Sequence, residues 1–280
     1  QSACAELTAL RLLDADGLDA ILDQAGALIR DDPQIGVRLA QLVRQLATQA
    51  EAPLATPRAT YLMAQANAAA GEMGIALALI DEARDGFERL GRRTEALRTN
   101  LGRAQVLNEI GRHAEALCSC QEILDDPELN AETSSSAVVD LLAAAHQNSG
   151  LCLELTGQFE SALDHYASAG VGYANIGATR AMAEVAYDRG LVLLALGQHA
   201  EALAAFTLAA ATFREGGFRA LLAMALTNTA EVHLYRGEYQ SCLDVLREAN
   251  EALAGISSPV GDHVRLLTAA RAYSALHLWP

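Results

Sequence analysis

The chain has 280 residues, of which 51% are hydrophobic and 5% aromatic; it contains no lysine and its net charge is −15 at pH 7. So acidic a chain argues against a nucleic-acid partner bound through its phosphates, and no apolar run reaches the roughly 20 residues that a membrane-spanning helix needs. Alanine and leucine dominate while strand-favouring residues are sparse, so the composition predicts an all-α protein.

The first part of the chain predicts helices over residues 2–13 and 16–30. Asp32 is a suitable N-cap for a third helix that begins at Pro33 and runs to about residue 50. We interpret residues 1–56 as N-terminal capping helices or as one diverged repeat. The opening segment has no basic region followed by an apolar stretch, so no signal peptide is expected. The cysteines read as reduced thiols that act as small core residues, which predicts a cytoplasmic location.

A repeat begins after Pro57. A glycine followed five residues later by a small residue occurs five times, with 40, 46, 40 and 40 residues between successive glycines. The pairs are Gly71 and Ala76, Gly111 and Ala116, Gly157 and Ala162, Gly197 and Ala202, and Gly237 and Cys242. A small residue also lies seven positions before each glycine, and an apolar one nine positions after it. This pattern predicts hairpins in which each glycine ends the first helix and the small residues allow the helices to approach closely.

A second glycine ends three of the repeats, at Gly91, Gly177 and Gly217. An aromatic residue precedes it by four positions each time, which predicts the end of the second helix and a turn into the next repeat. The 46-residue repeat lacks this ending. Its polar stretch from Asp125 to Ser136 predicts an inserted loop of about six residues.

The last predicted element is a helix over residues 260–278, which follows Ser257-Ser258-Pro259. One interpretation is that it covers the last exposed apolar face, as end repeats must. The alternative is that it forms the first helix of a further repeat in a longer protein.

The repeat resembles the tetratricopeptide repeat (TPR), in which a small residue, Gly, Ala, an aromatic residue and Ala recur at fixed offsets. Gly150, Gly157, Ala162, Tyr166 and Ala169 form one of the best copies. The period of 40 is similar to the longer-helix type common in bacterial multidomain proteins. The ten residues from Ala96 to Gln105 are similar to TPR arrays that precede CHAT protease domains.

The resemblance implies a right-handed superhelical solenoid of antiparallel helix hairpins. Five repeats are expected over residues 57–254, at about 57–91, 92–132, 133–177, 178–217 and 218–254, with a C-terminal helix in residues 255–280.

No catalytic, metal or cofactor site is predicted. The five cysteines match no zinc spacing, and Cys118 and Cys120 would point to different faces of a helix. No four-spaced histidine pair is present, and without lysine a phosphate-binding Gly-Lys-Ser or Gly-Lys-Thr motif is ruled out. Gly170 and Gly172 would lie at the end of a second helix with no strand before them.

Family analogy implies that inward-facing side chains recur 13, 10, 9, 6 and 3 residues before each repeat glycine. This selects Arg58, Tyr61, Gln65, Arg98, Gln105, Asn108, Gln147, Asn148, Glu154, Glu184, Tyr187, Asp188, Asn228, Glu231 and Leu234. The predicted wall is polar, basic at its start and acidic later, because no arginine lies between Arg112 and Arg180 while ten acidic residues do.

The resulting functional hypothesis is a scaffold that binds a peptide or protein segment in its concave groove, as part of a larger regulatory or signalling protein. A partner with a basic stretch fits the acidic part of the wall. A second hypothesis is a self-assembling scaffold whose end helices stack between copies. The third is an enzyme with its site in the groove.

Overall fold

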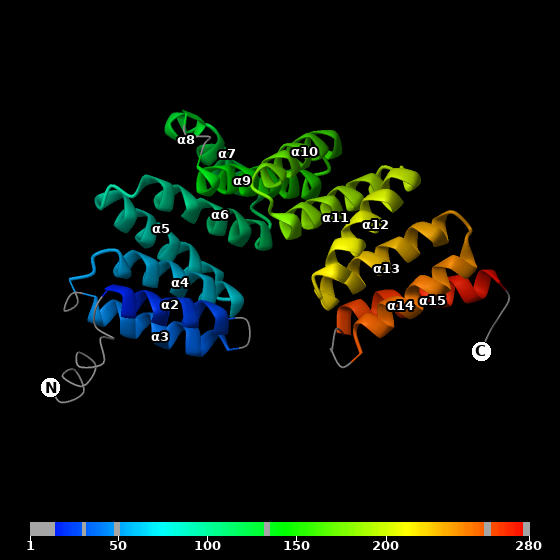
Figure 1. Cartoon of the computed structure of the whole chain (residues 1–280), viewed down its shortest axis with the longest axis horizontal. Coiled ribbons are helices and arrows are strands. Elements are labelled where there is room, and N and C mark those ends of the chain that lie inside the picture. Colours follow the sequence, from blue (N-terminus) through cyan, green and yellow to red (C-terminus); the bar gives the residue numbers. More distant parts are fainter. Residues whose placement is uncertain (1–14, 30–31, 48–50, 132–134, 255–258, 277–280) are drawn as a thin grey trace. The chain divides into compact units, whose positions relative to one another are not determined.

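The structure is a computed structural model that describes residues 15–29, 32–47, 51–131, 135–254 and 259–276. Within them the chain forms helices α2–α15 joined by short turns, with no strand (Figure 1). The predicted helix over residues 2–13 lies outside this described part. The chain divides into two compact units, residues 1–133 and residues 134–280. The all-α prediction is confirmed.

Unit 1 is a stack of antiparallel helices. Its elements are α2 (Ala15–Leu28), α3 (Pro33–Leu46), α4 (Ala55–Ala69), α5 (Met73–Arg89), α6 (Arg93–Glu109), α7 (His113–Leu124) and the short α8 (Pro127–Ala131). Each helix from α2 to α7 packs against the next one along the chain. Helices two apart also meet, α2 against α4 and α4 against α6. The first helices of successive hairpins therefore form one wall.

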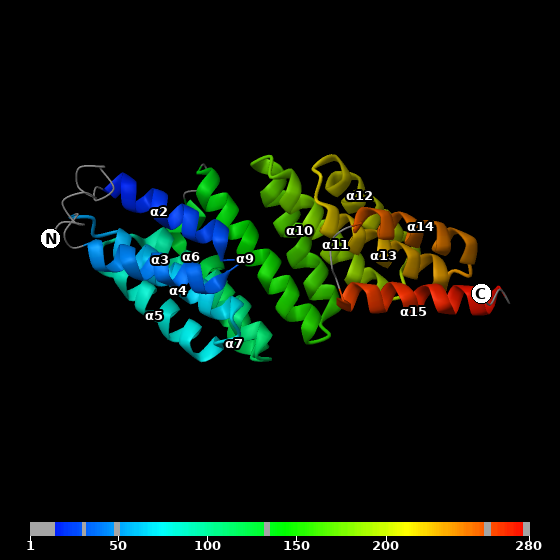
Figure 2. The ribbon, with the colours of Figure 1, turned by 90° about the horizontal axis from the view of Figure 1, so that it is seen from below.

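Unit 2 repeats this arrangement. Its elements are α9 (Ser136–Leu155), α10 (Phe159–Asn175), α11 (Thr179–Ala195), α12 (His199–Glu215), α13 (Arg219–Tyr235), α14 (Tyr239–Ala252) and α15 (Pro259–Ala275). Consecutive helices pack together, and α9, α11 and α13 form a wall of first helices. Figure 2 shows α15 alongside α13 and α14. The TPR-like stacking of antiparallel hairpins predicted from the repeat is confirmed.

The predicted glycine turns are confirmed by the backbone. Among the described glycines, those with a positive φ, between 67° and 82°, are Gly71, Gly91, Gly111, Gly157, Gly177, Gly197, Gly217 and Gly237. These are the five glycines that end first helices and the three that end second helices. The left-handed conformation strains any residue with a Cβ, which explains why glycine recurs at these positions.

Steric crowding explains why a small residue lies seven positions before each turn glycine. A Cβ on Gly150 would lie 2.6 Å from a ring carbon of Tyr166, and one on Gly190 would lie 2.5 Å from a ring carbon of Phe206. Both rings are fully buried. The hairpins therefore close by placing the aromatic ring of the second helix directly on the backbone of the first.

The two helices predicted after residue 15 are present as α2 and α3. The Asp32 side chain accepts hydrogen bonds from the backbone N–H groups of Gln34 at 3.0 Å and Ile35 at 3.2 Å, so it caps α3 as expected. Pro33 occupies the first turn, where its missing N–H costs no hydrogen bond. The described helix ends at Leu46, several residues before the predicted end near residue 50.

The insertion after α7 differs from the predicted loop, because Pro127–Ala131 form the helix α8. Asp126 is 3% exposed and caps this helix through the N–H groups of Glu128 and Leu129, at 3.1 and 3.0 Å. Its other carboxylate oxygen accepts two hydrogen bonds from Arg93, at 3.0 and 2.6 Å. Burial would raise the pKa of Asp126, but these hydrogen bonds and Arg93 lower it overall. The hydrogen bonds between Asp126 and Arg93 thus attach the insertion to the start of α6.

The cysteines behave as predicted for α7, where Cys118 is exposed and Cys120 is buried. Cys152 and Cys242 are buried core residues, and Cys4 lies outside the described residues. None of the described helices has the length and apolarity to cross a bilayer.

Candidate functional site

The walls of first helices follow one contact rule in both units. The residue ten positions before a turn glycine meets the residue nine positions before the glycine of the next hairpin. The pairs are Tyr61 with Gly102, Gln147 with Asp188, and Tyr187 with Asn228. Five of these six residues are polar, and the sixth has no side chain. The inner side of each wall is therefore built from side chains that contact one another across successive hairpins.

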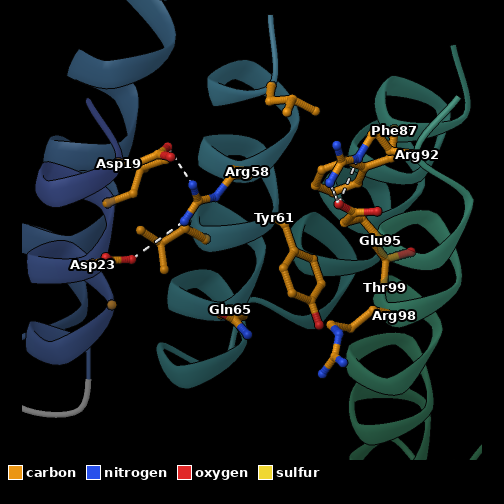
Figure 3. Close-up of a pocket in the computed structure, with 14 residues that line it drawn as sticks. Asp19, Asp23, Arg58, Tyr61, Gln65, Phe87, Arg92, Glu95, Arg98 and Thr99 are labelled. Atoms are coloured by element: carbon orange, nitrogen blue, oxygen red, sulfur yellow. Dashed lines mark hydrogen bonds and ion pairs between the residues drawn. The ribbon is translucent and has the colours of Figure 1, made fainter. Parts of the chain in front are cut away.

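In unit 1, this contact places a tyrosine ring against a bare backbone. A Cβ on Gly102 would lie 2.6 Å from the hydroxyl oxygen of Tyr61, so only glycine leaves room for the ring. Figure 3 shows Tyr61 reaching from α4 towards α6, with its hydroxyl beside Arg98. Burial raises the pKa of the Tyr61 phenol, and the nearby positive charge of Arg98 offsets part of the rise.

Two hollows lie along α4 on this side of unit 1, with volumes of about 620 and about 570 Å³. Both are lined by residues of α2, α4, α5 and α6, and they share Gly26, Tyr61 and Gln65. Because they share these residues, we treat them as two halves of one groove, called here the α4 groove. Tyr61 and Gln65 lie where the halves join.

Apolar side chains make up part of the first half of the α4 groove, among them Leu22, Leu62 and Phe87. Leu62 and Phe87 belong to the buried core of unit 1, so they form a fixed floor. The second half is lined by Ala64, Ala68 and other small or apolar residues together with Gln105. The groove therefore combines apolar contact area with amide groups.

Charged residues of both signs line the first half of the α4 groove. Arg58 on α4 binds Asp19 of α2, with 2.5 Å between Nη1 and Oδ1, and Asp23, at 3.5 Å (Figure 3). Arg92, just before α6, donates its Nε–H to Glu95 at 2.8 Å. The prediction of a basic wall was therefore wrong here, because acidic residues of α2 and α6 balance the arginines.

In unit 2, the corresponding wall is acidic. Gln147 on α9 donates to the carboxylate of Asp188 on α11, at 2.8 Å, and accepts a hydrogen bond from the Tyr173 hydroxyl, at 3.1 Å. Burial raises the pKa of Asp188 to about 7; Gln147 opposes the rise, while the charges of Glu154 and Glu184 add to it. Asp188 therefore titrates near neutral pH.

Two tyrosine hydroxyls bind residues of this wall, one from α10 and one from α11. The Tyr166 hydroxyl donates to Glu154 at 2.8 Å, and the Tyr187 hydroxyl accepts from Asn228 at 2.8 Å. Burial raises the pKa of both phenols and of the Glu154 carboxyl. The predicted residues Gln147, Glu154, Tyr187, Asp188 and Asn228 therefore belong to one region that spans α9, α11 and α13.

The other predicted wall residues have partners within their own helix or hairpin. Asn148 donates to the Ala144 carbonyl oxygen, Glu184 accepts from Arg180, and Glu231 accepts from Tyr235. Asn108 is 9% exposed and lies 3.1 Å from Nδ1 of His113 on α7. It therefore points into its hairpin, and Leu234 is likewise buried against α14.

Sequence reasoning missed several residues of the α4 groove. Asp19 and Asp23 lie in α2, where no repeat glycine gives a register, and Gly102 was not selected although it lies nine residues before Gly111. A signal for Gly102 was available, since a glycine in mid-helix usually marks a close contact. The sequence also gave no indication that His146 and His165 would lie with their Nδ1 atoms 3.1 Å apart.

Gly170 and Gly172 both lie inside α10 and do not form a turn. A Cβ on Gly172 would lie 2.8 Å from Cβ of Ala143, so this glycine serves the close packing of α9 and α10. Within the part of the chain that the structure describes, no three His, Cys, Asp or Glu side chains are placed to hold a metal ion.

Comparison with known proteins extends the fold assignment. No protein-family model matches the chain, and no curated protein matches its sequence. Among solved structures, BtubC (BKLC) of P. vanneervenii is similar with a TM-score of 0.64 at 18% identity, covering 86% of this chain and 94% of that one. These values establish a common fold.

Two further structures share this fold. A Rap protein complexed with competence and sporulation factor matches with a TM-score of 0.64 at 14% identity, covering 94% of this chain and 87% of that one. A STAND signal transduction ATPase with a tetratricopeptide repeat sensor, from Pyrococcus horikoshii, matches with a TM-score of 0.63 at 13% identity. The match covers 92% of this chain and 37% of that larger protein.

Proposed function

We propose that this chain is a TPR-type interaction scaffold that binds a peptide or protein segment along its walls of first helices. The observation that carries the proposal is the α4 groove of unit 1. It is an open channel lined by residues of α2, α4, α5 and α6, some of which the repeat pattern selects, and Leu62 and Phe87 of its floor belong to the buried core.

The chemistry of the α4 groove suits an extended peptide. Amide side chains such as Gln65 and Gln105 both donate and accept hydrogen bonds, as a peptide backbone requires. Tyr61 offers a large contact area with few rotatable bonds. The first half is lined by three arginines and three acidic residues, whose charges balance, so the groove favours apolar side chains flanked by backbone polar groups over a highly charged ligand.

Similar folds support this proposal by analogy. The Rap protein with the same fold was solved in complex with competence and sporulation factor, and the STAND protein uses a TPR sensor. We further propose that the chain works without catalysing a reaction, as a cytoplasmic bacterial module within a larger regulatory or signalling protein.

The groove proposal is tested with peptides selected from a random display library on the full 280-residue chain. We expect a selected peptide to lose at least about tenfold in affinity for the Gln65→Ala, Gln105→Ala double variant, because each lost hydrogen bond contributes about 1 kcal/mol. Gln24→Ala and Gln45→Ala together serve as the matched control, since both glutamines are exposed and line neither hollow. An equal loss of affinity in both double variants would show that the peptide binds outside the α4 groove.

We propose in addition that the acidic wall of unit 2 receives a basic stretch of the partner. Asp188, Glu154 and Glu184 lie close enough for their charges to raise the pKa of Asp188. A cation bound there would relieve this repulsion and lower the pKa of Asp188, so binding should release protons near pH 7.

The test is fluorescence anisotropy of an arginine-rich peptide at several salt concentrations. The charge-reversed variant Glu184→Arg, Asp188→Arg, Glu231→Arg should abolish binding. A control with the same change of charge at the exposed residues Glu160, Asp164 and Glu201 should retain it. Unchanged binding by the first variant would refute the basic-partner proposal while leaving the α4 groove untouched.

A further inference from the structure

Two histidines of unit 2 face each other across a hairpin. His146 lies on α9 and His165 on α10, and these helices pack against each other. The Nδ1 atoms are 3.1 Å apart, while the ring centres are 5.1 Å apart. Because the nitrogens are closer together than the ring centres, the Nδ1 edges of both rings point into the same space. Both side chains are half-buried.

The hairpin fold does not require histidine at these positions. His146 lies eleven residues before the turn glycine Gly157, and His165 lies eight residues after it. The next two hairpins hold apolar residues at the same positions, Ala186 with Ala205 and Leu226 with Val245. Leu226 and Val245 belong to one apolar cluster. The first hairpin of unit 2 therefore carries two imidazoles where the others carry apolar side chains.

The distance between the two Nδ1 atoms matches that between two ligands of one metal ion. Imidazole nitrogens bind Zn²⁺ at about 2.0–2.1 Å. Two nitrogens that are 3.1 Å apart, each about 2.05 Å from a common ion, subtend an angle of about 100° at that ion. This angle lies between the about 90° of neighbouring octahedral ligands and the about 109° of tetrahedral ones. The two rings therefore need little movement to bind one ion between them.

Metal binding also suits the hydrogen count of the pair. When both imidazoles are neutral, each carries one hydrogen, on Nδ1 or on Nε2. Without a metal, one ring holds its hydrogen on Nδ1 and donates it to Nδ1 of the other ring. With a metal, both rings hold their hydrogen on Nε2, and both Nδ1 lone pairs bind the ion. The neutral pair changes only by a tautomer shift in one ring, so it releases no proton.

The charges of this segment favour a cation. Residues 134–179 contain four carboxylates and no arginine. The carboxylate of Asp164, beside His165 in sequence, is close enough for its negative charge to act on the His165 imidazole. A divalent cation at the pair is therefore attracted by its surroundings and meets no positive side chain from these residues.

We propose that His146 and His165 bind one divalent late first-row transition ion, such as Ni²⁺, Cu²⁺ or Zn²⁺, through their Nδ1 atoms. Imidazole suits these ions, whereas Mg²⁺ and Ca²⁺ prefer oxygen ligands. The described residues place no third His, Cys, Asp or Glu with the pair. The remaining coordination positions are therefore filled by water or by a donor from a bound partner. The site does not involve the α4 groove, so it is independent of the peptide-binding proposal.

The first test is isothermal titration calorimetry of the full chain with NiCl₂ at pH 7.5, above the ordinary imidazole pKa of about 6.5. The chain carries Cys4→Ser and Cys118→Ser, because Cys118 is an exposed thiol that could bind the ion. We expect one equivalent of Ni²⁺ to bind. Absence of saturable binding at concentrations up to about 1 mM would overturn the proposal.

The pair variant His146→Leu, His165→Val should lose this binding. It carries the residues that the third hairpin of unit 2 has at these positions, so it should fold, which circular dichroism checks. The control variant His113→Ala, His263→Ala also removes two histidines but keeps the pair, and it should bind Ni²⁺ with unchanged affinity. Retained binding in the pair variant, or an equal loss in both, would overturn the proposal.

Two further measurements separate a metal site from a hydrogen bond between the rings. His165→Gln keeps a polar group beside His146 but removes one metal ligand, so the affinity for Ni²⁺ should fall at least about tenfold. Urea unfolding should show the folding equilibrium constant rising about elevenfold at a free Ni²⁺ concentration ten times the dissociation constant. The pair variant should show no such rise. Undiminished affinity in His165→Gln, or equal stabilisation of the pair variant, would leave the histidines only a hydrogen-bonding role.

Discussion

The close contact at Gly190 allows a quantitative test of the repeat packing. Gly190→Ala would place a Cβ 2.5, 2.7 and 2.9 Å from three ring carbons of Phe206. Carbon atoms normally approach to about 3.5–4.0 Å, so the ring or the backbone must move. Phe206 is fully buried and contacts Ala202, Leu193 and Val232 in the core, so the ring has little room.

The expected cost follows from two opposing effects. Overpacking of a well-packed core costs about 1–3 kcal/mol, whereas Gly→Ala within a helix gains about 1 kcal/mol. We therefore expect Gly190→Ala to lower the free energy of unfolding by up to about 2 kcal/mol. Gly170→Ala is the matched control, because Gly170 also lies within a helix but its Cβ would meet the nearest atom, on Val185, at 3.9 Å. It should stabilise by about 0.5–1 kcal/mol.

Urea unfolding followed by far-ultraviolet circular dichroism measures both variants. The signs should be opposite. If Gly190→Ala were stabilising to the same extent as Gly170→Ala, the first and second helices would not meet at this point. The structural explanation of the small residue before each turn glycine would then be refuted.

Three further predictions follow from named contacts. Asp188→Asn should stabilise the chain at pH 8 by about 1–3 kcal/mol and have little effect at pH 4. The pKa of Asp188 is raised to about 7 in the folded chain, so its ionisation destabilises the fold progressively as pH rises from the ordinary carboxyl value of about 4 to about 7. Urea unfolding at several pH values measures this. Asp126→Ala should destabilise by about 1–3 kcal/mol, since it removes the cap of α8 and leaves Arg93 without its carboxylate partner. Gly102→Ala should change stability by less than about 1 kcal/mol but displace Tyr61, which its near-ultraviolet circular dichroism would report.

Each of these predictions has a control on the same chain. Asp164→Asn, at an exposed position, should change the stability at pH 8 by much less than Asp188→Asn does. Asp125→Ala should lower the free energy of unfolding by less than Asp126→Ala does, because Asp125 is exposed. Gly74→Ala, where a Cβ would meet no atom within 4 Å, should leave the tyrosine signal unchanged. Equal effects in a variant and its control would contradict the assigned contact.

The turns and the hairpin packing could be predicted because they depend on short-range sequence. A left-handed backbone requires glycine, so Gly157 and its equivalents are visible at a fixed period. The contact between Gly150 and the Tyr166 ring also lies within one hairpin. The contacts between first helices were predicted in part, because the repeat offsets select Gln147 and Asp188 but do not show that the two bind each other.

The remaining features depend on partners that no local pattern reveals. Asp126 is buried because Arg93, 33 residues earlier in the chain, reaches it. The charge balance of the α4 groove depends on Asp19 of α2, a helix without a repeat glycine. In each case the missing information was the identity of the facing residue.

The central claim is that a peptide binds along α4 on the inner side of unit 1. Photo-crosslinking tests it most directly, with a benzophenone amino acid in place of Gln65 and, as the control, in place of the exposed Gln45 on α3. With a library-selected peptide, the account predicts a crosslink from position 65 that excess unlabelled peptide suppresses, and none from position 45. A crosslink from position 45 alone, or equal yields from both, would contradict it.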